Sequence, residues 1–259
     1  KANRLKGGTA AVMLEPVGPE SGTRPVDKNF CKGVEALCRK YGALLIFDEV
    51  VTAFRVSMSG AQGYFGVSPD LTVFGKVMAG GYPGAGGLGG KKEYMKHLGA
   101  GLDDTGKKVK KAFCGGTMSA NPLSCVAGYT MLEEMEKADA CYKAAQMGDR
   151  LTAGLQEIIK KRNLPFVAFN QGSICHLETV GTLNFSINWK KPWTIPSVLD
   201  ATSARKKEMT HMGAAYMAEG LVTLAGSRLY TSAAYTEEMI DDAVARFDKV
   251  FENIVCLEK

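Results

Sequence analysis

The sequence lacks the features that would place the protein in a membrane or outside the cell. No apolar run approaches the ~20 residues that a membrane-spanning helix needs. The first residues, KANRLKGG, are polar and no apolar core follows them, so the sequence shows no secretory signal peptide. The seven cysteines are scattered without a CxxC pair, which indicates reduced thiols rather than a disulfide framework. We therefore expect a cytoplasmic protein.

The sequence also lacks the patterns of a metal centre or a nucleic-acid-binding surface. His97, His176 and His211 show no ligand spacing with one another or with cysteine, so we expect no metal site. The formal net charge of +5 is small, and the basic residues are interspersed with acidic ones without a basic–aromatic stripe. Nucleic acid is therefore not an expected partner.

What is present is ordinary for a globular protein. The 259 residues include 46% hydrophobic and 23% charged side chains, and this length allows one large or two modest domains. Two short apolar runs end in polar side chains that could carry chemistry. The run at 43–47 is too short for a lone helix, reads as a buried strand, and is followed by Asp48. The run at 71–74 is followed by Gly75 and Lys76.

Ligands of open α/β sheets bind at the carboxyl ends of parallel strands. Two neighbouring strands could therefore place the carboxylate of Asp48 and the amine of Lys76 at the same edge of a sheet. This pair suits pyridoxal 5′-phosphate, which needs a lysine for a Schiff base and an acid against its ring nitrogen.

A set of motifs with fixed order and spacing surrounds these two residues. They are LIFDEV at 45–50, FRV at 54–56, GAQ at 60–62, GVSPDL at 66–71, GK at 75–76 and GTMSANP at 116–122. In this order they resemble the class III aminotransferases, which are fold-type I enzymes that use pyridoxal phosphate. Within that class the chain looks most like glutamate-1-semialdehyde aminomutase and its relatives.

The resemblance implies a role for each matched residue. Lys76 would form the Schiff base and then move the proton between the substrate carbon and the cofactor carbon. Asp48 would bind the pyridine nitrogen, and Val50 would pack on one face of the ring. Gly116 and Thr117 would hold the cofactor phosphate across the interface of a homodimer.

The resemblance also suggests residues for substrate binding. In many class III aminotransferases a glutamate shortly after a Glu-Pro pair contacts an arginine that can bind a substrate carboxylate. Glu20 and Arg228 fit these two places, and a solvated pair of charges is the alternative. Arg55 matches an arginine of the family that we interpret as structural.

The first part of the chain predicts an α/β fold. A strand at 10–14, a helical pattern over 30–41 and the strand at 43–47 form a βαβ unit, so the strands should be parallel. Asp27 is the expected N-cap of this helix and Gly42 its end. We expect residues 1–137, with a long last helix over 123–137, to form part of a large domain that binds pyridoxal phosphate and has a mostly parallel sheet.

Residues 138–259 are expected to form an α+β small domain at the carboxyl end. The expected elements are helices at 142–161 and 209–217, strands at 166–169, 174–177, 183–187, 220–223 and 228–231, and a last helix capped by Thr236. The glycine-rich run at 80–90 follows a lysine-bearing turn rather than a strand, so it does not indicate dinucleotide binding.

Proteins of this family begin well before the position matched by Lys1, with a phosphate-binding loop that has no counterpart here. We therefore expect a fragment, a chain completed by another chain, or a truncated homologue. The first hypothesis for its function is amino-group transfer between an amino donor and a carbonyl acceptor. The alternatives are a 2,1-aminomutase that acts on a semialdehyde, or a non-catalytic subunit that binds a partner.

Overall fold

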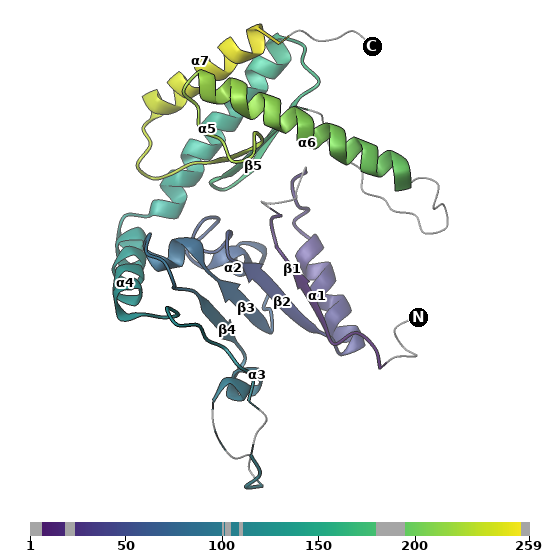
Figure 1. The fold of residues 1–259 in the computed structure, drawn as a ribbon, viewed down its shortest axis with the longest axis vertical. Helices are drawn as coiled ribbons and strands as arrows, with labels where there is room; N and C mark the ends of the chain where they lie inside the picture. Colours follow the sequence, from purple (N-terminus) through teal and green to yellow (C-terminus); the bar gives the residue numbers. More distant parts are fainter. Residues whose placement is uncertain are drawn as a thin grey trace. The chain divides into compact units, whose positions relative to one another are not determined.

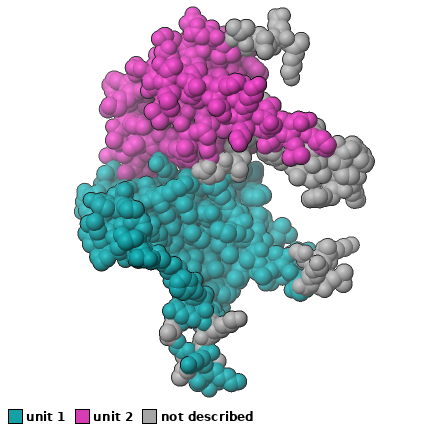
Figure 2. Space-filling model, viewed as in Figure 1, with its two compact units in different colours: residues 1–18, 26–139 teal, residues 19–25, 140–259 magenta. Residues whose placement is uncertain are grey.

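The computed structural model describes residues 7–18, 24–99, 101, 105–108, 111–179 and 195–254. The chain forms two compact units, which are coloured separately in Figure 2. Unit 1 comprises residues 1–18 and 26–139, and unit 2 comprises residues 19–25 and 140–259. Across the described ranges, no helix combines the length and the apolar character that crossing a membrane requires.

Unit 1 is built on a four-stranded sheet with the strand order β1-β2-β3-β4 (Figure 1). Its elements are β1 (Ala11–Leu14), α1 (Phe30–Tyr41), β2 (Leu44–Glu49), α2 (Gly60–Phe65), β3 (Leu71–Phe74), the 3₁₀ turn η2 (Lys76–Ala79), β4 (Gly87–Gly90), α3 (Lys92–Met95), the 3₁₀ turn η3 (Lys96–Leu98) and α4 (Pro122–Lys137). The first three strands are parallel, as the βαβ pattern predicted, and β4 is antiparallel to β3.

The ends of α1 test the capping predictions. Gly42 adopts the left-handed conformation with φ 67°, and its amide donates to the carbonyl of Cys38, so it ends the helix as predicted. The prediction for the other end was wrong. Asn29 occupies the N-cap, whereas Asp27 lies two residues earlier and accepts a hydrogen bond from the Asn29 amide (2.7 Å).

Within the described part of unit 1, helices cover one face of the sheet. Along β2 the buried side chains alternate with half-buried ones, and Leu45 and Phe47 are fully buried on the face where α1 and α2 pack. The opposite face carries Ile46, which pairs in register with Met13 of β1. Met13 is 56% exposed. Because parallel sheets usually have both faces covered, this apolar face is unusual in the part of the chain that the structure describes.

The buried carboxylate of Asp70 joins three elements at the amino-terminal edge of this sheet. It accepts hydrogen bonds from the Leu45 amide of β2 (2.8 Å), from Arg39 of α1 (2.6 Å) and from Lys91 after β4 (2.6 Å). Burial acts to raise the pKa of Asp70, but the hydrogen bonds from Lys91, Leu45 and Arg39 outweigh it and lower the pKa to about 2.

Unit 2 packs helices on one face of a three-stranded antiparallel sheet with the order β5-β6-β7 (Figure 1). Its elements are α5 (Ala140–Lys161), β5 (Val167–Gln171), β6 (Ile174–Glu178), α6 (Ile195–Ala218), β7 (Arg228–Tyr230) and α7 (Glu237–Glu252). The core lies between the helices and alternate residues of the strands, with Leu155, Leu177, Tyr216 and Phe247 among its fully buried members. Thr236 caps α7 by accepting a hydrogen bond from the Met239 amide, as predicted.

Two predictions in unit 2 were wrong. Residues 220–223 do not form a strand, and only an isolated bridge joins Leu224 to Arg228. The helix expected over 209–217 begins at Ile195. The prediction missed this extension because residues 200–208, DATSARKKE, carry no large apolar side chain. The strand expected at 183–187 lies outside the described residues.

We expect Asp70→Asn to destabilise the protein at neutral pH by roughly 2 kcal/mol, since one pKa unit corresponds to about 1.4 kcal/mol. The folded-state pKa lies below the unfolded value of about 3.9. The stabilisation is therefore fully present above pH 4 and is lost as the pH falls through about 2. Urea unfolding of both proteins at several pH values measures this, and the two curves should converge in acid. Equal stability at pH 7 would contradict the role of Asp70.

Candidate functional site

Asp48 and Lys76 leave the sheet of unit 1 at the same edge. Strands β2 and β3 are parallel, and Asp48 pairs in register with Val73. Lys76 begins the turn that follows β3. Asp48 is half-buried on the uncovered face of the sheet, and Lys76 is exposed. The structure thus places the predicted carboxylate and amine at the carboxyl ends of adjacent strands.

The backbone of Lys76 is strained. Its φ is 49°, in the left-handed region that a residue with a Cβ atom adopts at a cost of about 1–2 kcal/mol. The turn η2 is held in this conformation by α4. A Cβ atom on Gly128 of α4 would lie 2.2 Å from the carbonyl oxygen of Met78, so the two backbones pack directly against each other. Such strain at a polar residue is typical of functional sites.

Val50 connects the two predicted groups. Its amide donates a hydrogen bond to Asp48 Oδ1 (3.2 Å). Its side chain packs against the residue before the lysine, because a Cβ atom on Gly75 would lie only 3.2 Å from Val50 Cγ1. Asp48, Val50, Gly75 and Lys76 therefore form one continuous group of neighbours. We expect a planar cofactor ring with a basic nitrogen and an aldehyde to fit the chemistry of this donor set.

Glu49 is a further residue of this region to which sequence reasoning gave no role. It is fully buried, and its carboxylate accepts hydrogen bonds from the amides of Ala61 (2.5 Å) and Gln62 (3.1 Å). The hydroxyl of Thr52 donates to it as well (3.0 Å). The signal was available in the sequence, since Glu49 continues the period of two that Leu45 and Phe47 set on the buried face.

Gly116 and Thr117 lie in an exposed turn that precedes α4. The Gly116 carbonyl accepts a hydrogen bond from the Ser119 amide (3.0 Å). The turn is tied to the loop after η2, because the Ala120 amide donates to the Gly84 carbonyl (2.8 Å). Asn121 then caps α4 by accepting a hydrogen bond from the Ser124 amide (3.0 Å). The Thr117 side chain is accessible to solvent or to another molecule.

The two predicted substrate-binding residues lie outside the described part of unit 1. Glu20 lies outside the described residues. Arg228 is half-buried in β7 of unit 2, where it pairs in register with His176. Burial, followed by the charges of Arg228 and Arg205, lowers the pKa of His176 to about 4, so this imidazole is neutral at pH 7.

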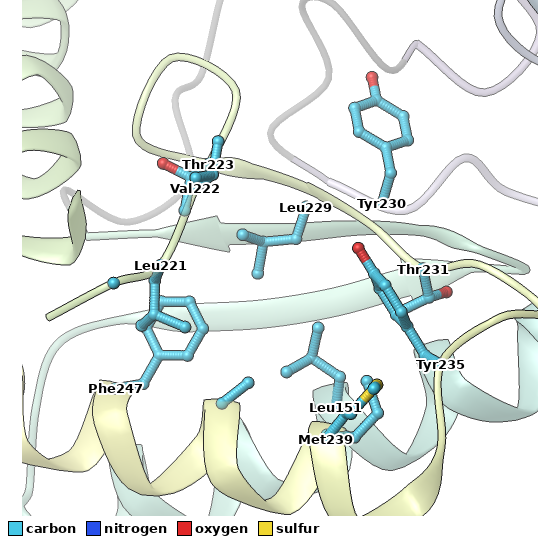
Figure 3. A pocket seen from close by; sticks show the side chains of 13 residues that line it. Leu151, Leu221, Val222, Thr223, Leu229, Tyr230, Thr231, Tyr235, Met239 and Phe247 are labelled. Carbon is cyan, nitrogen blue, oxygen red and sulfur yellow. The ribbon is translucent and has the colours of Figure 1, made fainter.

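A cavity of about 330 Å³ lies in unit 2 between α7 and the segment that follows α6 (Figure 3). Its walls are apolar side chains such as Leu151, Leu229 and Phe247, together with the hydroxyl groups of Thr231 and Tyr235. No predicted site residue lines it. We place the candidate site at the β2–β3 edge instead, because the carboxylate and the amine there can carry out acid–base chemistry.

Comparison with known proteins tests the predicted resemblance. The family model for aminotransferase class III matches residues 2–250. Glutamate-1-semialdehyde 2,1-aminomutase 2 of Lysinibacillus sphaericus is 36% identical over 250 residues, which cover 95% of this chain and 53% of the relative. The chain thus spans about half the length of the curated relatives it matches.

Solved structures agree with this result. An omega-transaminase from Sphaerobacter thermophilus superimposes with a TM-score of 0.73 at 27% identity, over 94% of this chain and 52% of that one. A transaminase with PLP bound has a TM-score of 0.75 at 22% identity, over 97% of this chain and 54% of that one, and shows the shared fold. These matches confirm the predicted α/β fold class, and with the family model they show that the chain belongs to the class III aminotransferases.

Proposed function

We propose that this chain carries the lysine-bearing part of an active site that transfers an amino group with the help of pyridoxal 5′-phosphate. The observation that carries the proposal is the strained Lys76 at the same sheet edge as Asp48. Membership of the class III aminotransferases supports it. The reaction would move an amino group from a donor to a carbonyl acceptor.

Each residue of the group has a task in this proposal. When bound, pyridoxal phosphate supplies an aldehyde and a ring that withdraws electrons from the substrate. Lys76 would hold the aldehyde carbon and then carry a proton between substrate and cofactor. Asp48 would keep the ring nitrogen protonated, and its bond to the Val50 amide orients the carboxylate for that task. Val50 would pack on the ring.

The uncovered face of the sheet bears on the completeness of this site. Asp48 lies at the end of that face, and the chain spans about half of its relatives. We infer that further polypeptide, in the same protein or in another, has to cover the face before the site excludes water. A subunit that binds a partner without catalysis remains the alternative if the protein takes up no cofactor.

A second observation favours an intramolecular reaction. The relative that is 36% identical is a glutamate-1-semialdehyde 2,1-aminomutase. In a 2,1-aminomutase of this kind the amino group leaves and re-enters the same carbon skeleton, so no keto product is released. We propose Arg228 as the contact for a substrate carboxylate in either reaction, with Glu20 as the residue that pairs with Arg228, because a guanidinium group binds carboxylates in a bidentate manner.

The exposed face of α4 supports a homodimer. Leu123, Val126 and Tyr129 follow one another at helical spacing, and each is more than 60% exposed. Met118, in the turn that contains Thr117, is similarly exposed. We propose that a second copy of the chain covers this apolar surface, because solvent-exposed apolar patches typically mark interfaces. Gly116 and Thr117 could then serve the cofactor phosphate of the partner copy.

The test of the lysine is its covalent attachment to the cofactor. After incubation with pyridoxal 5′-phosphate and borohydride reduction, the protein should gain the mass of one phosphopyridoxyl group, since the imine forms with loss of water and is then reduced, and this group should be found on the peptide that contains Lys76. We expect Lys76→Ala to abolish this gain, the visible absorbance of the complex and the turnover, since the proposal assigns the covalent bond to the Lys76 amine. Lys92→Ala, at an exposed position of α3, is the matched control and should behave like the wild type. A cofactor that still attaches to K76A would refute the assignment, and no attachment to the wild type would favour the partner-binding alternative.

The test of the dimer is a charge placed on α4. We expect Leu123→Glu to convert a dimer into a monomer, because a carboxylate buried in an apolar interface costs several kcal/mol. Light scattering after size-exclusion chromatography measures the mass. Leu37→Glu is the matched control, since Leu37 of α1 is exposed to a similar extent (55% against 62%) and lies outside the proposed surface. If both variants keep the same mass as the wild type, α4 is not the interface.

A further inference from the structure

The buried carboxylate of Glu49 lies at the end of β2 and binds the start of α2, at the far end of the loop that connects the two elements. In the part of the chain that the structure describes, its carboxylate accepts hydrogen bonds from the backbone and from side chains. Besides the amides of Ala61 and Gln62 and the hydroxyl of Thr52, the Gln62 side chain donates to it at 3.4 Å. Because an ionised carboxylate accepts several hydrogen bonds and donates none, this environment matches its chemistry.

The backbone of Gly60 lies close to this carboxylate. Gly60 adopts φ 65°, and a Cβ atom there would lie 2.6 Å from Glu49 Oε2. A side chain at position 60 would therefore collide with the carboxylate and also strain the backbone. The loop of residues 50–59 is consequently pinned at its far end to the side chain of the strand residue that precedes it.

The pinned loop in turn contacts both predicted groups. Val50, its first residue, donates its amide to the Asp48 carboxylate and packs against Gly75, the neighbour of Lys76. The ring of Phe54, in the middle of the loop, packs near the ring of Phe74 at the end of β3, with 6.2 Å between the ring centroids. Any shift of the loop would move the carboxylate of Asp48 relative to the lysine-bearing turn.

We propose that Glu49 is a positioning residue of the cofactor site: it pins the loop of residues 50–59, and through Val50 it fixes Asp48 against the turn of Lys76. The effect on cofactor binding rests on the proposed function, whereas the pinning of the loop rests only on the contacts of Glu49. Glu49 itself faces away from the cofactor, since it lies on the buried face of β2 and Asp48 on the opposite one.

The test compares two buried carboxylates of the same sheet. Glu49→Gln keeps the size of the side chain but turns one oxygen into an amide donor that opposes the donors of Ala61, Gln62 or Thr52. Asp70→Asn is the matched control, because Asp70 is equally buried but is tied to the start of β2 through Leu45, at the opposite edge. Both changes should lower the stability of unit 1, so a loss of stability does not separate them.

The discriminating readouts are hydrogen exchange and the affinity for pyridoxal 5′-phosphate, both measured on the intact protein under conditions where each variant is folded. We expect E49Q to accelerate exchange in residues 50–59 and at the amides of Met78 and Gly80, which bond within η2. We also expect it to raise the dissociation constant of the cofactor about 10- to 100-fold. D70N should leave that constant within about twofold, because its partners do not touch the loop.

A milder variant covers the case in which E49Q does not fold. Thr52→Val removes one donor to Glu49 and keeps the shape of the side chain, so it should show the same effects at smaller size. Equal effects of E49Q and D70N on the cofactor, or unchanged exchange in the loop of E49Q and T52V, would overturn the proposal. If the wild type takes up no pyridoxal phosphate, the proposed function fails and the exchange data alone decide whether Glu49 pins the loop.

Discussion

The parallel pairing of β2 with β3 is the constraint on which the rest of unit 1 depends. It brings the carboxyl ends of both strands to one edge, and a buried carboxylate lies at each end of β2. Asp70 binds the Leu45 amide at the start of β2, and Glu49 binds the start of α2 at its end. An unsatisfied buried carboxylate is expensive, so each one commits the surrounding backbone to a single arrangement. The backbone that carries the residues at this edge, such as Asp48, is therefore held in that arrangement.

The apolar run at the start of β2 indicates a more fully covered sheet than the described part of unit 1 provides. A strand whose side chains are apolar on both faces is typical of a sheet covered on both sides. Here Leu45 and Phe47 are covered, whereas Ile46 is half-exposed and the neighbouring Met13 more so. The mismatch between the sequence of the strand and its surroundings fits a chain that spans about half of its relatives. It also explains why the lysine and the carboxylate by themselves make an open edge and not a closed pocket.

Local signals in the sequence predicted β1, α1, β2, β3 and α4 of unit 1 and the neighbourhood of its two key residues, but not α2 or α3. The apolar runs, the Gly42 cap and the βαβ order depend on short-range physics, so they could be read without the structure. The tie between Glu49 and the amides of residues 61 and 62 could not, because it joins positions that only the folded loop brings together. The extent of α6 was missed for another reason. Residues 200–208 in its middle carry no large apolar side chain, so the segment lacks the periodicity on which the prediction relied.

Three of the four described non-glycine residues of unit 1 with positive φ lie near the proposed chemistry, and the fourth, Asp139, follows the end of α4. Phe54, Lys76 and Ala120 all have positive φ although they carry a Cβ atom, which costs each about 1–2 kcal/mol. They belong to three different segments, namely the loop after β2, the turn after β3 and the turn before α4. Each segment is also held by a specific contact: the Glu49 carboxylate for the first, the α4 backbone for the second and the Gly84 carbonyl for the third. Strain of this size persists only where the surroundings determine the conformation, and a site that has to hold an amine and a carboxylate in fixed relation is a place where that cost has a use.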